Sequence, residues 1–199
     1  GIDGAELCRA RDDALSQGNI GLYARDCQAA HFDDVSLEPF RWFEDDYEDD
    51  TAARPLDVLA GTWRTDRGWL RGTVGARSRQ AIALVGCPQW RDYKFRAHVM
   101  PANAGAVGLY FGCTGPQDYL LFRWGGSRQD PDEQRQELWR VAGGAPELVA
   151  GRVAPLTGDP HEVEVTTDRG YVAVSVDGRT VLEGADVGRD VPSPRCGRV

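Results

Sequence analysis

The chain has 199 residues, of which 41% are hydrophobic and 27% charged, the balance typical of a folded, water-soluble domain. Its net charge of -8 and single lysine argue against a nucleic-acid partner, because binding a phosphate backbone needs clustered basic side chains. No apolar run approaches the roughly 20 residues that cross a bilayer, so we expect no membrane insertion. Five cysteines without CxxC spacing argue against a zinc site and leave isolated buried thiols or one disulfide as alternatives.

The N-terminal part contains an unusual stretch, GNIGLYARDCQAAHFDDVSLEP at residues 18–39. Its apolar residues alternate with polar ones on both sides of a polar corner, which predicts a β-hairpin with one buried face. A hairpin of this type normally closes a β-sandwich, whereas here it lies near the start of the chain.

An internal repeat would explain why this stretch lies near the start of the chain. IDGAEL at residues 2–7 and VDGRTVL at residues 176–182 share an Asp-Gly turn followed by apolar residues. We interpret residues 1–39 as the tail of a preceding repeat, or as permuted terminal strands, and residues 40–199 as a sandwich domain that lacks its usual last strands. Chance similarity between two hairpins is the alternative. We favour residues 18–39 folding back to supply an edge of this domain, and exchange between chains is a further alternative.

The following segments are short and polar. Residues 40–50 begin as an aromatic strand and pass into an acidic run, and residues 51–59 form a connector that contains Pro55. Two tryptophans flank a predicted turn at residues 66–68, and residues 81–85 form a short apolar strand that ends at Gly86.

The middle and C-terminal parts have the clearest β pattern. Strands are predicted at residues 93–99, 106–113, 118–124, 136–141, 147–153, 162–166 and 171–176, separated by Gly, Pro and Asp clusters. Since no segment has a sustained helical period, we predict an all-β fold of two antiparallel sheets packed face to face.

Five motifs in this order resemble a known family. They are PQWRDYKFRAHV, GAVGLYFGCTGPQDYLLFRW, LWRVAGGAPELVA, HEVEVTTDRGYVAVSVDG and GLYA…FDDVSLEP. Together they resemble the concanavalin A-like (laminin-G-like) jelly-roll domains of bacterial extracellular proteins, including the domain of 3-keto-disaccharide hydrolases. The last motif closes the domain in that family but precedes it here, so we expect a jelly roll that is circularly permuted or strand-exchanged.

An acidic run at residues 44–50 holds six carboxylates in seven positions. Clustered oxygen ligands suit calcium, and the family resemblance implies a structural site of this kind near the first and last strands. We predict that Asp33, Asp34, Glu44, Asp45 and Asp46 hold calcium if the FDDV strand pairs with the FEDD strand. A solvated, edge-protecting acidic face is the alternative.

Aromatic and arginine residues on the central strands form a second candidate site. The predicted ligand-binding residues are Tyr110, Tyr119, Arg123 and Trp139. In sandwiches of the resembled family these strands form the concave sheet, where sugar rings stack on aromatic faces. Alternation places Tyr119, Leu121 and Arg123 on one face of their strand, and packing without a ligand is the alternative for them.

Catalytic signals are weak. The three histidines are far apart in the sequence, and no nucleophile elbow, HExxH, phosphate loop or dinucleotide motif is present. The sequence therefore favours a non-catalytic recognition or structural module of a secreted or cell-surface repeat protein, which binds glycan or protein ligands and contacts neighbouring repeats. The alternatives are a 3-keto-disaccharide-type hydrolase and a purely architectural repeat that forms assemblies.

Overall fold

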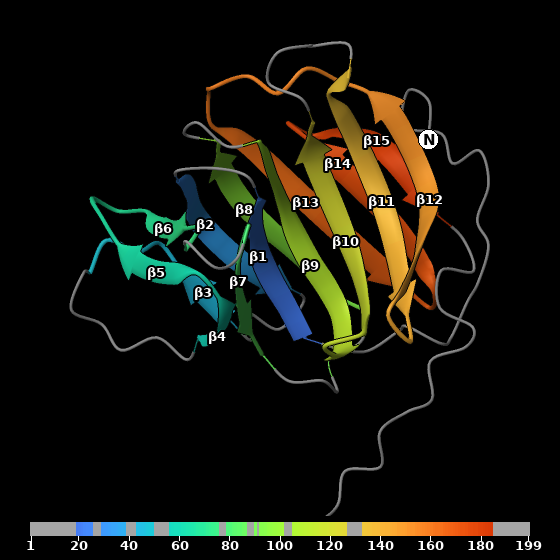
Figure 1. The fold of residues 1–199 in the computed structure, drawn as a ribbon, viewed down its shortest axis with the longest axis horizontal. Helices are drawn as coiled ribbons and strands as arrows, with labels where there is room; N and C mark the ends of the chain where they lie inside the picture. Colours follow the sequence, from blue (N-terminus) through green and yellow to red (C-terminus); the bar gives the residue numbers. More distant parts are fainter. Residues whose placement is uncertain are drawn as a thin grey trace, which may run out of the picture.

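Two antiparallel sheets face each other in the computed structural model (Figure 1). The structure describes residues 19–25, 29–38, 43–49, 56–75, 79–86, 90, 92–101, 105–126 and 133–184. The all-β, two-sheet antiparallel sandwich predicted from the sequence is confirmed.

The first sheet has seven strands. In order across the sheet they are β12 (Ala145–Val153), β11 (Arg135–Ala142), β10 (Asp118–Gly125), β9 (Ala106–Gly115), β1 (Asn19–Arg25), β7 (Gln80–Val85) and β4 (Asp57–Ala60). Every described pairing within this sheet is antiparallel.

The second sheet has eight strands. Seven of them follow the order β15 (Arg179–Gly184), β14 (Tyr171–Val176), β13 (His161–Asp168), β8 (Lys94–Met100), β2 (Ala30–Glu38), β6 (Leu70–Thr73) and β5 (Thr62–Thr65). The remaining strand, β3 (Phe43–Asp45), pairs with β2. The FDDV and FEDD segments therefore do pair, as the calcium prediction required.

The hairpin predicted at residues 18–39 is wrong. β1 pairs with β7 and β9 in the first sheet, whereas β2 pairs with β6 and β8 in the second. Both strands occupy interior positions, so the expectation that they supply a sheet edge is also wrong. The physical reason is that the apolar side chains of the two strands, such as Leu22 and Phe32, face each other across the core.

The predicted strands of the middle and C-terminal parts are present with small changes at their ends. One segment predicted as a connector is a strand instead. Asp57–Ala60, within the segment predicted as a connector, forms β4 at the edge of the first sheet. Its Val58 and Leu59 are exposed, so it lacks the alternation of buried and exposed side chains that identifies a strand in a sequence.

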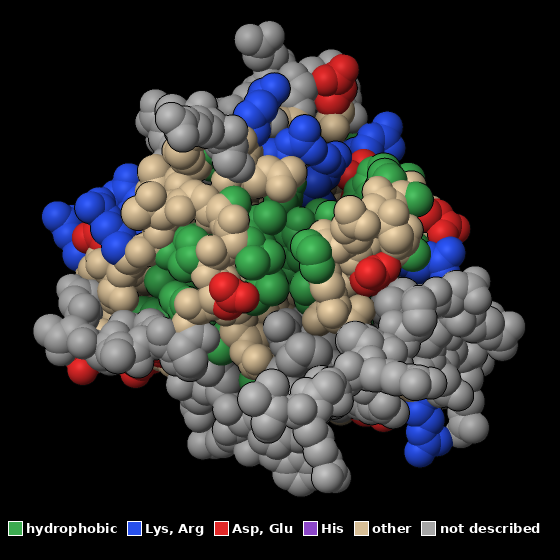
Figure 2. Space-filling view, turned by 60° about the horizontal axis from the view of Figure 1, so that its bottom comes forward, with side chains coloured by type: hydrophobic (Ala, Val, Ile, Leu, Met, Phe, Trp, Pro, Cys, Tyr) green, Lys and Arg blue, Asp and Glu red, His purple; other side chains and the backbone are tan. Residues whose placement is uncertain are grey.

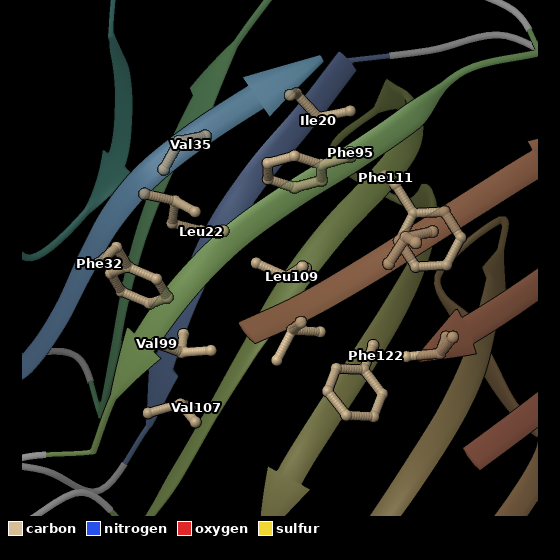
Figure 3. Close-up of a cluster of buried hydrophobic side chains, with 14 of the residues drawn as sticks. Ile20, Leu22, Phe32, Val35, Phe95, Val99, Val107, Leu109, Phe111 and Phe122 are labelled. Atoms are coloured by element: carbon tan, nitrogen blue, oxygen red, sulfur yellow. The ribbon is translucent and has the colours of Figure 1, made fainter. Parts of the chain in front are cut away.

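The core lies between the sheets (Figure 3). Its labelled members include Ile20 and Leu22 from β1, Phe32 from β2, Phe95 from β8 and Phe111 from β9, each at most 3% exposed. Burial of one such side chain stabilises the fold by about 1.5–3 kcal/mol. The two N-terminal strands thus place side chains in the centre of the core.

Other sequence predictions fall outside the described residues. These include the proposed repeat lead-in at residues 2–7 and every cysteine except Cys113, which is buried and free. In the part of the chain that the structure describes, no helix has the length and apolarity needed to span a membrane.

Candidate ligand-binding site

A hollow of about 240 Å³ lies on the outward face of the seven-stranded sheet. We call it the tyrosine hollow, and its lining residues are Tyr23, Arg25, Gln80, Tyr110, Tyr119, Leu121, Arg123, Trp139, Val141 and Pro146. Figure 2 shows hydrophobic side chains gathered over the middle of the described surface, with Lys and Arg side chains on several sides and single Asp or Glu side chains among them.

Strand alternation places these side chains on the outward face. On β9, Leu109 and Phe111 belong to the core between the sheets, so Tyr110 between them points the other way. On β10, Leu120 and Phe122 are also in the core, as the sequence pattern predicts. The outward side chains form a separate apolar cluster made of Tyr23, Leu84, Tyr110, Cys113 and Leu121, with Ile82, Tyr119 and Trp139 packed against it.

Three tyrosines form a continuous aromatic surface. The ring of Tyr110 lies between those of Tyr23 and Tyr119, with ring centroids 5.4 Å and 4.6 Å away. Tyr23 is 2% exposed and Tyr110 is 5% exposed, whereas Tyr119 is only partly buried. Tyr23 and Tyr110 therefore make the floor, and Tyr119 remains available to an incoming ring.

A glycine opens the space between two of the polar groups. Gly108 on β9 is the cross-strand partner of Tyr23 on β1 and of Arg123 on β10. A Cβ at this position would lie only 2.0 Å from the backbone oxygen of Phe122. The β10 backbone therefore packs closely against residue 108, and no side chain separates Tyr23 from Arg123 on the outward face.

A buried carboxylate fixes two further residues of the tyrosine hollow. Glu137 Oε2 accepts a hydrogen bond from Trp139 Nε1 at 2.9 Å and lies 2.6 Å from Arg123 Nη2. The side chain of Glu137 is only 8% exposed. Glu137 therefore holds the Arg123 guanidinium and the Trp139 indole in defined orientations without lining the hollow itself.

The phenols of Tyr23 and Tyr110 and the thiol of Cys113 stay neutral at physiological pH. Burial raises the pKa of Tyr110, and its hydrogen bond with Tyr119 raises this pKa further. Burial also raises the pKa of Tyr23, although Arg25 and Arg123 act in the opposite direction. Burial raises the pKa of Cys113 to about 11, so its thiol is a packing group rather than a nucleophile.

The structure brings all four predicted ligand-binding residues to the tyrosine hollow, namely Tyr110, Tyr119, Arg123 and Trp139. Sequence reasoning missed Tyr23, Arg25 and Gln80. The first of these had a detectable signal, because GLYA around Tyr23 resembles GLYF around Tyr110. Arg25 and Gln80 become neighbours only through the pairing of β1 with β7.

The predicted calcium residues are engaged in local contacts. Asp33 Oδ1 and Asp45 Oδ1 accept hydrogen bonds from the backbone N–H groups of Asp34 and Tyr47. Asp34 Oδ2 lies 2.9 Å from His98 Nδ1.

Among the residues that the structure describes, no group of three or more His, Cys, Asp or Glu is placed to hold a metal ion. Asp46 Oδ1 accepts a hydrogen bond from the Glu48 backbone, and the side chain of Glu44 lies outside the described part. Calcium binding by these residues stays a prediction.

One histidine lies in a chain of polar contacts. His161 Nε2 lies 2.7 Å from Thr157 Oγ1, and His161 Nδ1 lies 2.8 Å from Asp177 Oδ2. Asp177 Oδ1 also accepts a hydrogen bond from the backbone N–H of Glu162. The Asp177 side chain is 55% exposed, so we interpret this chain as a link between the turn after β14 and the loop before β13.

Comparison of the chain with models of protein families, with curated proteins and with solved structures finds no match in any of the three. The resemblance to concanavalin A-like domains therefore stays a prediction. The functional assignment depends on the residues of the tyrosine hollow.

Proposed function

We propose that this protein is a non-catalytic recognition module that binds a glycan in the tyrosine hollow. The observation that carries the proposal is the convergence of Tyr23, Tyr110, Tyr119 and Trp139 with two arginines on one outward sheet face. Aromatic faces bind the apolar C–H face of a sugar ring, while planar polar groups meet its hydroxyls. Apolar packing alone would not require the polar groups to lie on the same outward face.

The size of the tyrosine hollow indicates how much of a glycan it holds. Its volume of about 240 Å³ is below the roughly 300–1,000 Å³ of sites that enclose drug-sized ligands. We therefore expect one sugar ring in the hollow and the rest of the chain along the sheet face.

The lining favours binding over hydrolysis. Glycosidases need two carboxyl groups on opposite sides of the scissile bond. Among the described residues that line the tyrosine hollow, none is Asp or Glu, and the nearby Glu137 is bound to Arg123 and Trp139. The hydrolase alternative has no comparable support.

A glycan array of immobilised oligosaccharides, followed by calorimetry with the bound ones, tests the proposal. Truncating an aromatic residue central to an interface costs about 2 kcal/mol, which is about 30-fold in affinity. We expect losses of this order for Tyr119→Ala and Trp139→Ala. Tyr171→Ala on the second sheet is the matched control and should bind as the unchanged protein does.

Two outcomes would overturn the proposal. One is the absence of binding to any glycan, which would favour a protein ligand or a purely architectural role. The other is release of sugar from a bound oligosaccharide, which would indicate a hydrolase. As a glycan-binding module the protein would act at a cell surface or after secretion, with neighbouring repeats as its other partners.

A further inference from the structure

The charge of the tyrosine hollow differs from that of the whole protein. The chain carries a net charge of -8, yet the described lining residues include two arginines and no carboxylate. Guanidinium groups that line a binding site favour anionic ligands over neutral polar ones.

Both arginines act on the same part of the hollow. Arg25 hydrogen-bonds the hydroxyl of Tyr23, and Arg123 faces Tyr23 across Gly108. The two guanidinium groups both lower the pKa of Tyr23 against the effect of burial, as expected for positive charges near one phenol. Arg25 lies two residues from Tyr23 on β1 and Arg123 lies across Gly108, so both arginines are near the Tyr23 side chain.

Arg123 keeps hydrogen-bonding capacity that the protein does not use. Its Nη2 lies 2.6 Å from Glu137, whereas its Nε is buried without a hydrogen-bond partner. A guanidinium has five N–H donors in a plane, and the Arg123 side chain is 25% exposed, so the exposed part of the group can meet the oxygens of an anionic ligand. Glu137 fixes the plane of the Arg123 guanidinium group, so this group is oriented before a ligand binds.

We propose that the tyrosine hollow binds an acidic sugar, whose carboxylate or sulfate accepts hydrogen bonds from Arg25 and Arg123 while its ring stacks on Tyr119 and Trp139. The inference depends on the proposed glycan-binding function and adds the class of sugar. An anionic group fits this lining because it can accept charge-assisted hydrogen bonds from both guanidinium groups while Arg123 keeps its contact with Glu137.

The test uses three sets of oligosaccharides on one array. These are uronate oligosaccharides, sulfated oligosaccharides, and the carboxyl-reduced or desulfated form of each. We expect binding to an acidic set that is at least tenfold tighter than binding to its neutral form, and that weakens as salt is raised from 50 to 500 mM. The preferred acidic set identifies the anionic group.

Variants that remove one arginine charge test which arginine binds the acidic group. A hydrogen bond to a charged group contributes enough for a loss of about 10- to 100-fold, which we expect for Arg25→Gln and for Arg123→Gln with the acidic set. Arg179→Gln, which removes an exposed charge on β15, is the control and should bind normally. If Arg123→Gln does not fold, Arg25→Gln carries the test, because it does not separate the Arg123–Glu137 pair.

The outcomes separate the two proposals. Equal binding of acidic and neutral forms, or unchanged affinity in the Arg25→Gln variant, would overturn the acidic-sugar inference and leave glycan binding intact. Binding to none of the sets, together with none to any neutral glycan, would overturn both.

Discussion

Replacing Glu137 tests the internal support of the tyrosine hollow. Its carboxylate contacts Arg123 Nη2 at 2.6 Å and Trp139 Nε1 at 2.9 Å, and a hydrogen bond to a charged group contributes about 1.5–3 kcal/mol. The Arg123 side chain is 25% exposed, so water replaces part of what it loses. We therefore expect Glu137→Ala to reduce the free energy of unfolding by about 3 kcal/mol. Glu137→Gln keeps an acceptor for Trp139 and should cost about half as much.

Equilibrium urea unfolding measures these changes, and a double-mutant cycle with Arg123→Met isolates the ion pair. We expect a coupling free energy above about 1 kcal/mol for this pair. The pair Arg140–Glu147 on β11 and β12 is the matched control. Because the Glu147 side chain is 59% exposed, its coupling should stay below about 0.5 kcal/mol. Equal coupling in the two cycles would refute the reasoning that burial makes Glu137 a fixed support.

Two further predictions concern pH and the N-terminal strands. Burial and the Arg71 charge lower the pKa of His31 below its usual 6.5, despite an opposing effect of Asp66. As the pH falls, the unfolded chain therefore takes up the proton first. The free energy of unfolding should decrease as the pH drops below about 6.5. His31→Gln should reduce this slope in melting temperatures measured between pH 7.5 and 5, and an unchanged slope would contradict the assignment. A chain shortened to residues 40–199 should show no cooperative urea transition by circular dichroism, because β6, β7, β8 and β9 each lose a strand partner. A cooperative transition would contradict the expectation that the N-terminal strands are needed for folding.

The sequence predicted those features that depend on local alternation. Phe95 and Val99 on β8 face the core, and Tyr119 and Arg123 lie opposite Leu120 on β10, as their spacing indicates. A period of two fixes which side chains share a face. The same alternation grouped Tyr110, Tyr119, Arg123 and Trp139 as one candidate site, because their strands follow one another in the chain.

Strand partners far apart in the sequence were not predictable in this way. Alternation in β1 and β2 indicates that each has one buried face, but two strands of one hairpin and two strands facing each other across a core give the same pattern. Tyr23 and Arg25 were missed as site residues for the same reason, because nothing near them in the sequence identifies β7 and β9 as their neighbours.

The position of β1 couples the fold to the site. This strand lies between β7 and β9, buries Leu22 in the core on one face and carries Tyr23 into the tyrosine hollow on the other. It also supplies Arg25, one of the two cations of the hollow. A sandwich that lost this strand would lose core packing, part of the aromatic floor and one of the two arginines together. Exchange of residues 19–38 between chains, which the sequence leaves open, would therefore make ligand binding depend on the neighbour that provides the strand.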